Sequence, residues 1–285
     1  MNALEEVDKE VANLVSSGIR IPPQPKLVTE IVSMLQANQL DLREMAEAIA
    51  QDAGLMAMMY KITRSAAFAR RRPPQSVEQI LALVGIRQTA MLVQSYGVTA
   101  ALKGSSAVLE QFWSRSGDIA QLASIIAYLR ISVCNISPEQ AYMAGIFHDC
   151  GVPILMQRFP DYCKVTGVTG AAHKWADVRS EDASFQVDHC SIGYLLARHW
   201  RLPDFVADAI LHHHHNLQQL SEHASRSMVA ILQLAIQIYS GEHGLSNPEW
   251  AQVADTVIEE LGIHPDDLDE FCDGVLDMFS GLQDG

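Results

Sequence analysis

The apolar residues of this chain recur at the spacing of an α-helix, and this constrains its fold more than any other feature. Leu27, Ile31 and Leu35 follow the 3.6-residue period, and so do Ile192 and Leu196 farther along. Segments that alternate apolar and polar residues, as half-buried strands do, are scarce. The sequence therefore predicts an all-α protein.

Several helix starts are marked by residues that cap the first turn. Ser76 with Gln79, and Ser137 with Gln140, both have the spacing of a capping box, in which the two side chains bond free backbone N–H groups. Ser137 is followed by Pro138, whose fixed φ and missing N–H suit the first helical position. We expect a helix to begin directly after each serine.

The charge of the chain is strongly negative and unevenly distributed. It has 34 Asp and Glu against 20 Lys and Arg, a formal net charge of -14, and no Lys or Arg follows Arg226. This balance argues against general binding to nucleic acid or to an anionic membrane. The balance turns acidic at the short polar stretch 103–106. We expect that stretch to divide the chain into two helical units, residues 1–104 and 105–285.

Hydropathy and cysteine usage favour a cytoplasmic protein. No apolar run approaches the length of about 20 residues that crosses a bilayer. The N-terminal residues are acidic and have no apolar core of a secretory signal. The five cysteines are an odd number without a CxxC pair, as expected of reduced thiols. We therefore expect the protein to reside in the cytoplasm and outside any membrane.

An adjacent histidine and aspartate stand in an apolar segment, 145–151, that we expect to be helical. His148 and Asp149 are ligand types that hold divalent ions in hydrolytic sites. A buried carboxylate without a partner is strongly destabilising, so we expect Asp149 to be paired. Taken alone, the dipeptide favours a hydrogen-bonded structural pair, and a metal site is the alternative.

Further histidines downstream extend this group. His189 follows Asp188, and residues 212–215 are four consecutive histidines at the end of a predicted helix. Neutral imidazole ligates metal ions and imidazolium donates to phosphate, so histidines clustered with a carboxylate build a metal or phosphate pocket. Alternatively, the histidine run caps the C-terminal end of its helix, where positive charge is favourable.

Several short segments follow one another in a set order along the chain. They are Ile21–Pro25, Ile49–Leu55, Ser65–Ala66, Ser76–Gly85, Phe112–Ser116, Ala144–Asp149, Asp188–Gly193, Trp200–Pro203 and Ala209–Ile210 with the histidine run after it. In this order they resemble the HDOD family, a bacterial signalling branch related to the HD metal-dependent phosphohydrolases. The resemblance implies two packed helical subdomains, the second similar to the HD helical core.

The resemblance also bears on metal binding. Catalytic HD relatives hold a metal ion with an early histidine, the His-Asp pair and a final aspartate. His148 and Asp149 match the pair, whereas Arg115 and Ile236 stand at the other two positions. Neither arginine nor isoleucine offers a lone pair to a cation. The resemblance therefore implies that His148 and Asp149 are vestigial and that no cofactor is bound.

Two expectations follow for the space that the metal ion occupies in catalytic HD relatives. We expect the Arg115 guanidinium to occupy it and to form a bidentate pair with Asp149. His189, His213 and His214 match additional histidines of multi-metal HD relatives and imply a polar pocket for an anion such as a nucleotide phosphate. A satisfied hydrogen-bond network without a ligand is the alternative. If a divalent metal binds instead, its expected ligands are His148, Asp149, His189 and His213.

We therefore expect a catalytically inactive or degenerate HD-like regulatory protein of signal transduction, which binds a protein or nucleotide partner. The alternative is an HD-type metal-dependent phosphohydrolase with a non-standard ligand set, completed by Asp118 or Asp188. Helices at 248–261 and 265–279 carry apolar stripes that pack on the body or, alternatively, mediate self-association or partner binding. The candidate ligand-binding residues are Arg115, His148, Asp149, His189, His213 and His214.

Overall fold

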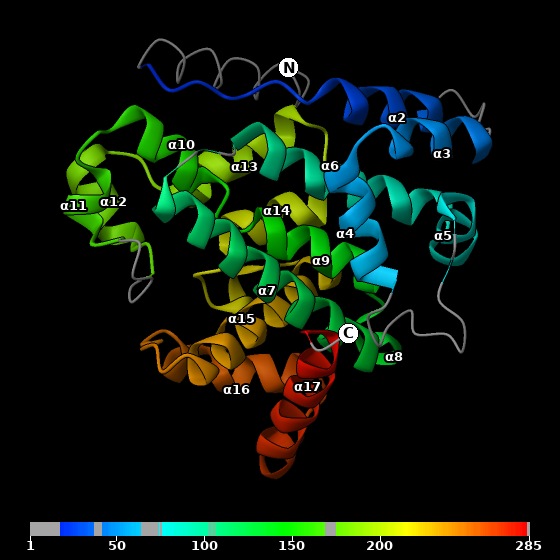
Figure 1. Ribbon diagram of the computed structural model, residues 1–285. Coiled ribbons are helices and arrows are strands. Elements are labelled where there is room, and N and C mark those ends of the chain that lie inside the picture. The colour runs from blue at the N-terminus through cyan, green and yellow to red at the C-terminus, as the bar shows by residue number, and fades with distance from the viewer. Residues whose placement is uncertain are drawn as a thin grey trace.

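The computed structural model describes residues 18–36, 42–63, 74, 76–102, 104, 106–168 and 175–283 of the chain. Within this part the chain forms helices and connecting turns and has no β-strand, which confirms the predicted all-α fold (Figure 1). None of the helices in it has both the length and the apolar character to span a bilayer. The Ser65–Ala66 segment of the family resemblance lies outside the described residues.

The first helices form the N-terminal part of the fold. They are α2 (Lys26–Gln36), α3 (Leu42–Ala50), α4 (Ala53–Thr63), α5 (Val77–Val84) and α6 (Ile86–Leu102). Ser76 caps α5 as predicted, since its hydroxyl accepts the Gln79 N–H. At the start of α4, Asp52 accepts the Leu55 N–H at 2.9 Å and the Tyr96 hydroxyl at 2.7 Å. A side chain of α6 thus helps to fix the first turn of α4.

The larger part of the fold is built around α7 (Ala107–Leu129) and α9 (Pro138–Phe147), which cross in close contact. A Cβ on Gly145 of α9 would lie 2.4 Å from the Cα of Ala120 on α7, so only glycine permits this approach. Ser137 and Gln140 form the predicted capping box at the start of α9. Around this pair lie α10 (Gly151–Arg158), α13 (His189–His199), α14 (Asp204–His212) and α15 (His223–Glu242).

The N-terminal and C-terminal parts share one apolar core. Helix α6 packs against α9, and buried residues of both parts join a single cluster. The Trp200 indole donates to the Pro22 carbonyl at 3.0 Å, and the Gln24 amide donates to the Trp200 carbonyl at 3.0 Å. The division into units 1–104 and 105–285 stays a prediction.

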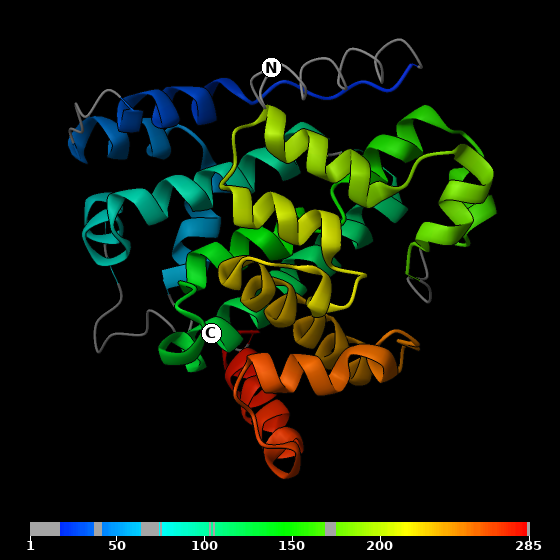
Figure 2. The same cartoon turned by 180° about the vertical axis from the view of Figure 1, so that it is seen from behind.

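The acidic end of the chain forms α16 (Trp250–Glu260), a short 3-10 turn η2 (Pro265–Asp267) and α17 (Leu268–Gln283), as the apolar stripes predicted. Both helices lie at the end of the molecule opposite α2 and α3 (Figures 1 and 2). Val257 and Val275 are fully buried. Arg130, which follows α7, donates to the carbonyls of Leu261 at 2.8 Å and Gly262 at 2.7 Å. These contacts fasten the acidic helices to the body.

The segment 145–151 is not one continuous helix, contrary to the prediction. Helix α9 ends at Phe147, residues 148–150 form a turn, and α10 begins at Gly151. The Cys150 N–H donates to the Phe147 carbonyl, three residues back, at 2.9 Å. The cause is Pro153, because a proline ring inside a helix clashes with the carbonyl four residues earlier, here that of Asp149. His148 and Asp149 therefore lie at a break between two helices.

Candidate functional site

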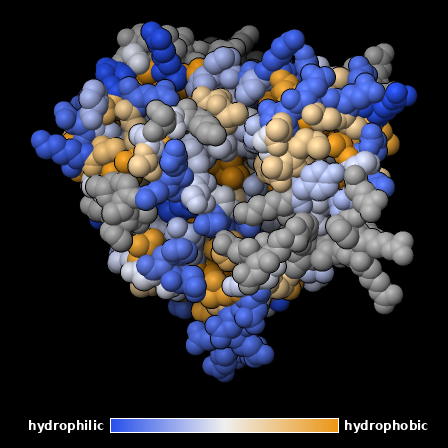
Figure 3. All heavy atoms as spheres, viewed as in Figure 1, coloured by the Kyte–Doolittle hydropathy of each residue, from blue (hydrophilic) through white to orange (hydrophobic). Residues whose placement is uncertain are grey.

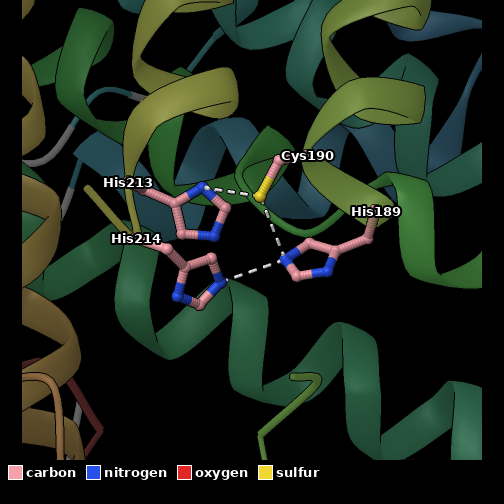
Figure 4. Close-up of side chains that lie close together, drawn as sticks. All are labelled: His189, Cys190, His213 and His214. Carbon is pink, nitrogen blue, oxygen red and sulfur yellow. Dashed lines mark hydrogen bonds between the residues drawn. The ribbon is translucent and has the colours of Figure 1, made fainter. Parts of the chain in front are cut away.

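Side chains from separate parts of the chain meet beside α7. His148 and Asp149 come from the turn after α9, His189 and Cys190 from the start of α13, and His213 and His214 from the end of α14. Figure 4 shows His213 and His214, which follow α14, facing His189 and Cys190, the first two residues of α13. With Arg115 of α7, the structure brings together all six candidate ligand-binding residues, and Cys190 joins them as a seventh residue that was not predicted.

Asp149 lies at the centre of this group and is almost fully buried. Its Oδ1 lies 3.2 Å from His213 Nε2 and 3.3 Å from His189 Nε2. Its Oδ2 lies 3.3 Å from His148 Nε2 and 3.8 Å from Arg115 Nη2. The two oxygens of one carboxylate therefore have different surroundings: two histidines at Oδ1, and one histidine with a guanidinium at Oδ2.

Arg115 does point at Asp149, but the two residues do not form the expected bidentate pair. Their closest approach of 3.8 Å is longer than a hydrogen bond, and the buried Nε of Arg115 has no hydrogen-bond partner. The guanidinium instead lies over the Trp175 ring, 4.5 Å from its centroid. This cation-π contact keeps the guanidinium beyond hydrogen-bonding distance of the carboxylate.

Two of the histidine rings are oriented by backbone carbonyls. The Nδ1 atom of His148 lies 2.7 Å from the Gly145 carbonyl, and the Nδ1 atom of His213 lies 2.8 Å from the Ile210 carbonyl. A carbonyl oxygen only accepts, so each Nδ1 carries a proton. In the neutral rings, the Nε2 atom then carries a lone pair, and this lone pair faces Asp149.

Two further rings are oriented by carboxylates. His189 Nδ1 lies 2.7 Å from Glu181 Oε2, and His214 Nδ1 lies 2.7 Å from Glu249 Oε2. Glu181 belongs to α12 (Val178–Phe185), is fully buried and also accepts the hydroxyl of Tyr162 from α11 (Tyr162–Thr166). Histidines that ligate metals are oriented by such carboxylates, which fix the tautomer and ring position. The Nε2 atoms of His189 and His214 approach to 3.1 Å.

The consequence is a convergence of acceptor atoms around Asp149. The four Nδ1 protons point outward, and the four Nε2 atoms point inward at a carboxylate and at one another. Lone pairs facing lone pairs repel, so such an arrangement requires a cation, either protons on the rings or a metal ion. Imidazole nitrogen and carboxylate oxygen are both ligands of divalent transition metals.

Protonation differs from residue to residue in this cluster. Burial would raise the pKa of Asp149, but the histidines around it hold that pKa well below its usual range. Burial would lower the pKa of His189, but Cys190, Asp149 and Glu181 together raise it well above the usual value. Burial and the neighbouring His214 lower the pKa of His213 well below the usual value. Without a metal, the surroundings therefore favour the charged form of Asp149 and of His189 and the neutral form of His213.

A cavity of about 640 Å³ opens over this cluster. His148, Asp149, Trp175 and Gln233 line it, and so does Ile236. Three buried polar atoms of its lining, His148 Nε2, Trp175 Nε1 and Gln233 Oε1, have no hydrogen-bond partner in the protein. The volume is that of sites for small organic ligands, and a ligand with polar groups would satisfy these atoms.

The carboxylates proposed to complete a metal site do not do so. Asp188 is the N-cap of α13, and its two oxygens accept the Ser191 N–H at 2.8 Å and the Ser191 hydroxyl at 2.7 Å. Asp118 is neither among the residues that line the cavity nor in the histidine and cysteine cluster of the described chain. Asp149 is the aspartate at the centre of the histidine cluster, and Asp177 also lines the cavity.

Sequence reasoning missed Cys190, Glu181 and Trp175. Cys190 directly follows His189, and its Sγ lies 3.4 Å from His189 Nε2. Burial raises the pKa of its thiol to about 11. The adjacency of a cysteine to a candidate ligand was the available signal. Glu181 and Trp175 carry no such signal, because only the fold brings them to the site.

Comparisons with known proteins agree with this fold. A profile of the HDOD domain matches residues 21–216. This chain belongs to the HDOD domain family. A Treponema pallidum relative, named only as an uncharacterized protein, is 25% identical over 245 residues. That match covers 83% of this HDOD chain and 46% of the relative, so the chain spans less than half of the relative's length.

Two solved structures share the fold of this HDOD protein. One, from Shewanella amazonensis, is provisionally named a metal-dependent phosphohydrolase; it is 17% identical, with a TM-score of 0.72 over 98% of this chain and 96% of its own. The other, from Marinobacter aquaeolei, is provisionally named a signal transduction protein; it is 18% identical, with a TM-score of 0.68 over 99% of this chain and 65% of its own. At these identities the likeness concerns the fold alone.

Proposed function

We propose that this HDOD protein is a regulatory component of signal transduction that acts by binding and does not hydrolyse phosphate esters. The observation that carries this proposal is the position of Arg115. Its Nη2 lies 3.8 Å from Asp149 Oδ2, and both side chains are 4% exposed. The fixed positive charge stands where HD-type relatives need a metal ligand, and it repels a cation from that oxygen.

The donor set supports the same conclusion. On the Oδ2 side of Asp149, His148 Nε2 can ligate a metal but the nearby Arg115 cannot. Ile236, which lines the cavity, offers no donor. On the Oδ1 side, His189 and His213 can hold one divalent ion, which would supply the positive charge that the converging lone pairs need. The residues therefore fit one metal ion and do not fit a second on the Arg115 side.

The cavity over the cluster is the proposed binding site of the protein. Its volume of about 640 Å³ suits a ligand of nucleotide size. Trp175 and Trp250 offer aromatic surface, and the exposed Arg179 in the lining offers a positive charge for a phosphate. Asp177 and Glu249 line the same cavity, so a phosphate would bind nearest Arg179. A signal would be passed on when such a ligand fills the cavity between α12, α15 and α16.

The test is a phosphodiesterase and phosphatase assay with added Mn²⁺, on the wild-type chain and on Asp149→Ala. We expect no turnover above that of the variant. Turnover that Asp149→Ala abolishes would contradict the proposal. A second variant, Arg115→His with Ile236→Asp, restores both donor types, and gain of turnover in it would support Arg115 and Ile236 as the cause of inactivity.

A metal-dependent phosphohydrolase is the second candidate. The observation that favours it is the inward orientation of the four histidine Nε2 atoms. Glu181 and Glu249 hold two of these rings by their Nδ1 atoms, as carboxylates do for histidines that ligate metals. Hydrolysis would also require a coordination position left open for water. The assay above separates the two candidates directly.

A further inference from the structure

Cys190 adds a sulfur donor to the three histidines on the Oδ1 side of Asp149 (Figure 4). One potential ligand atom from each of His189, Cys190, His213 and His214 lies within 4.8 Å of the others. The His189, Cys190 and His213 side chains are buried, and His214 is half-buried at the cavity wall. Two dipeptides, one at the start of α13 and one at the end of α14, supply all four donors.

Two of the distances between these donors are close to those around a small metal ion. Zinc binds nitrogen at about 2.0–2.1 Å and sulfur at about 2.3 Å, so a tetrahedron of such donors has edges of about 3.3–3.6 Å. Two edges of the group lie near this range: 3.4 Å from Cys190 Sγ to His189 Nε2 and 3.1 Å from His189 Nε2 to His214 Nε2. Cys190 Sγ lies 3.9 Å from His213 Nδ1, and all four donors lie within 4.8 Å of one another, so His213 would have to move closer to the other three when the ion binds.

We propose that His189, Cys190, His213 and His214 form a closed, four-coordinate zinc site in which the Cys190 thiolate takes the place that a water molecule holds in hydrolytic zinc sites. This inference rests on the proposed non-hydrolytic function. It adds a reason for the lack of hydrolysis, because the ion has no coordination position left for water. Binding of the ion releases the thiol proton and any proton on the His189 Nε2. Asp149 remains beside the ion and keeps its contact with Arg115.

Cys190 also determines which metal the site selects. Thiolate and imidazole donors favour zinc, whereas Mg²⁺ and Mn²⁺ prefer oxygen ligands. Glu181 and Glu249 hold the His189 and His214 rings by their Nδ1 atoms and so prepare Nε2 for the ion. The site is thus expected to bind zinc in the presence of excess Mg²⁺.

The test uses the full chain, purified without chelator from cells grown with zinc. Elemental analysis should find one zinc per chain, retained against excess Mg²⁺. Exchange of zinc for Co²⁺ should give a thiolate-to-cobalt charge-transfer absorption.

Cys190→Ser should lose this absorption and bind zinc at least about 100-fold more weakly, since even the outer partners of metal ligands contribute 10- to 100-fold. Cys134→Ser, which removes a buried cysteine of α8 (Ile131–Cys134), is the matched control and should keep both properties.

Absence of zinc from the wild-type protein, a cobalt form without the thiolate absorption, or equal zinc affinity in Cys190→Ser would each overturn the inference. The wild-type cobalt spectrum requires no variant, so a folding defect in Cys190→Ser leaves the test intact. These outcomes are distinct from failure of the proposed function, which would appear as phosphate-ester turnover lost in Asp149→Ala.

Discussion

The two oxygens of Asp149 have different neighbours, and this difference at the scale of single residues separates two classes of function. Oδ1 faces two metal-ligating histidines, His189 and His213, whereas Oδ2 faces one histidine, His148, and a permanent cation, Arg115. A substitution on one side should therefore have consequences unlike those of a substitution on the other.

Arg115→Met should destabilise the protein by about 3 kcal/mol, because it removes one partner of a buried charge pair. The free energy of unfolding in urea measures the loss. In the double variant Arg115→Met with Asp149→Asn, the cost should be smaller than the sum of the two single costs, since the buried pair is removed together. Additive costs would show that the two side chains do not interact.

Tyr96→Phe should cost about 1 kcal/mol of stability at neutral pH, because the Tyr96 hydroxyl donates to Asp52 at 2.7 Å. Urea unfolding measures this cost. Tyr128→Phe is the matched control, since Tyr128 is 43% exposed, and it should change stability little.

The same pair gives a pH dependence with a definite sign. Burial would raise the pKa of Asp52, but the Leu55 N–H and the Tyr96 hydroxyl hold it below its usual value. Asp52 therefore contributes stability above its unfolded pKa of about 3.9, and this contribution is lost as pH falls through the lower folded value. In Tyr96→Phe the acid loss should be smaller. An unchanged acid profile would show that Tyr96 does not set this pKa.

Sequence alone could identify the residue types of the site but not its contacts. His148, Asp149, His189, His213 and His214 stood out because adjacent polar residues are unusual in apolar segments. The bidentate pairing of Arg115 was a wrong prediction because Trp175, 60 residues away in sequence, holds the guanidinium. No local pattern reveals a contact of that kind.

At the scale of helices, the approach of α10 to α13 positions His189 against Asp149. A Cβ on Gly151 would lie 2.1 Å from the His189 carbonyl oxygen, so the two backbones are almost in contact. The helix break that starts α10 follows from Pro153, a signal present in the sequence and not recognised there. The helices themselves were predictable from period and capping, because those depend on nearby residues.

Gly151→Ala should destabilise the protein by about 2–3 kcal/mol, because the added methyl group forces α10 and α13 apart. Gly117→Ala is the matched control: nothing lies within 4 Å of its Cβ, and alanine suits the interior of α7. It should stabilise the protein by about 0.5–1 kcal/mol. Urea midpoints measure both, and similar effects at the two positions would argue against a close backbone contact at Gly151.

At the scale of the whole molecule, the acidic C-terminal helices lie beyond the part matched by the HDOD profile, which ends at residue 216. Arg130 joins them to the body through the carbonyls of Leu261 and Gly262. That the helices pack on the body was an expectation from their apolar stripes. Which residue fastens them was not predictable, because the bond spans more than 130 residues of sequence.

Arg130→Met should loosen the attachment of α16 and α17, because hydrogen bonds to a charged donor contribute about 1.5–3 kcal/mol. Amide hydrogen exchange should become faster in residues 250–283 and stay unchanged in α9. Arg43→Met removes an exposed ion pair with Glu47 and is the control. Equal exchange in the wild type and Arg130→Met would contradict this role.

The position of α16 and α17 also makes the charge distribution of the molecule asymmetric. No Lys or Arg follows Arg226, whereas residues 1–100 hold ten basic and ten acidic side chains. The N-terminal helices and α17 lie at opposite ends, and the projecting end around α17 is hydrophilic (Figure 3). The protein is therefore a permanent electric dipole as well as an anion. In an applied field it should orient with this end toward the anode, and salt should shorten the reach of its potential to about 8 Å at physiological strength.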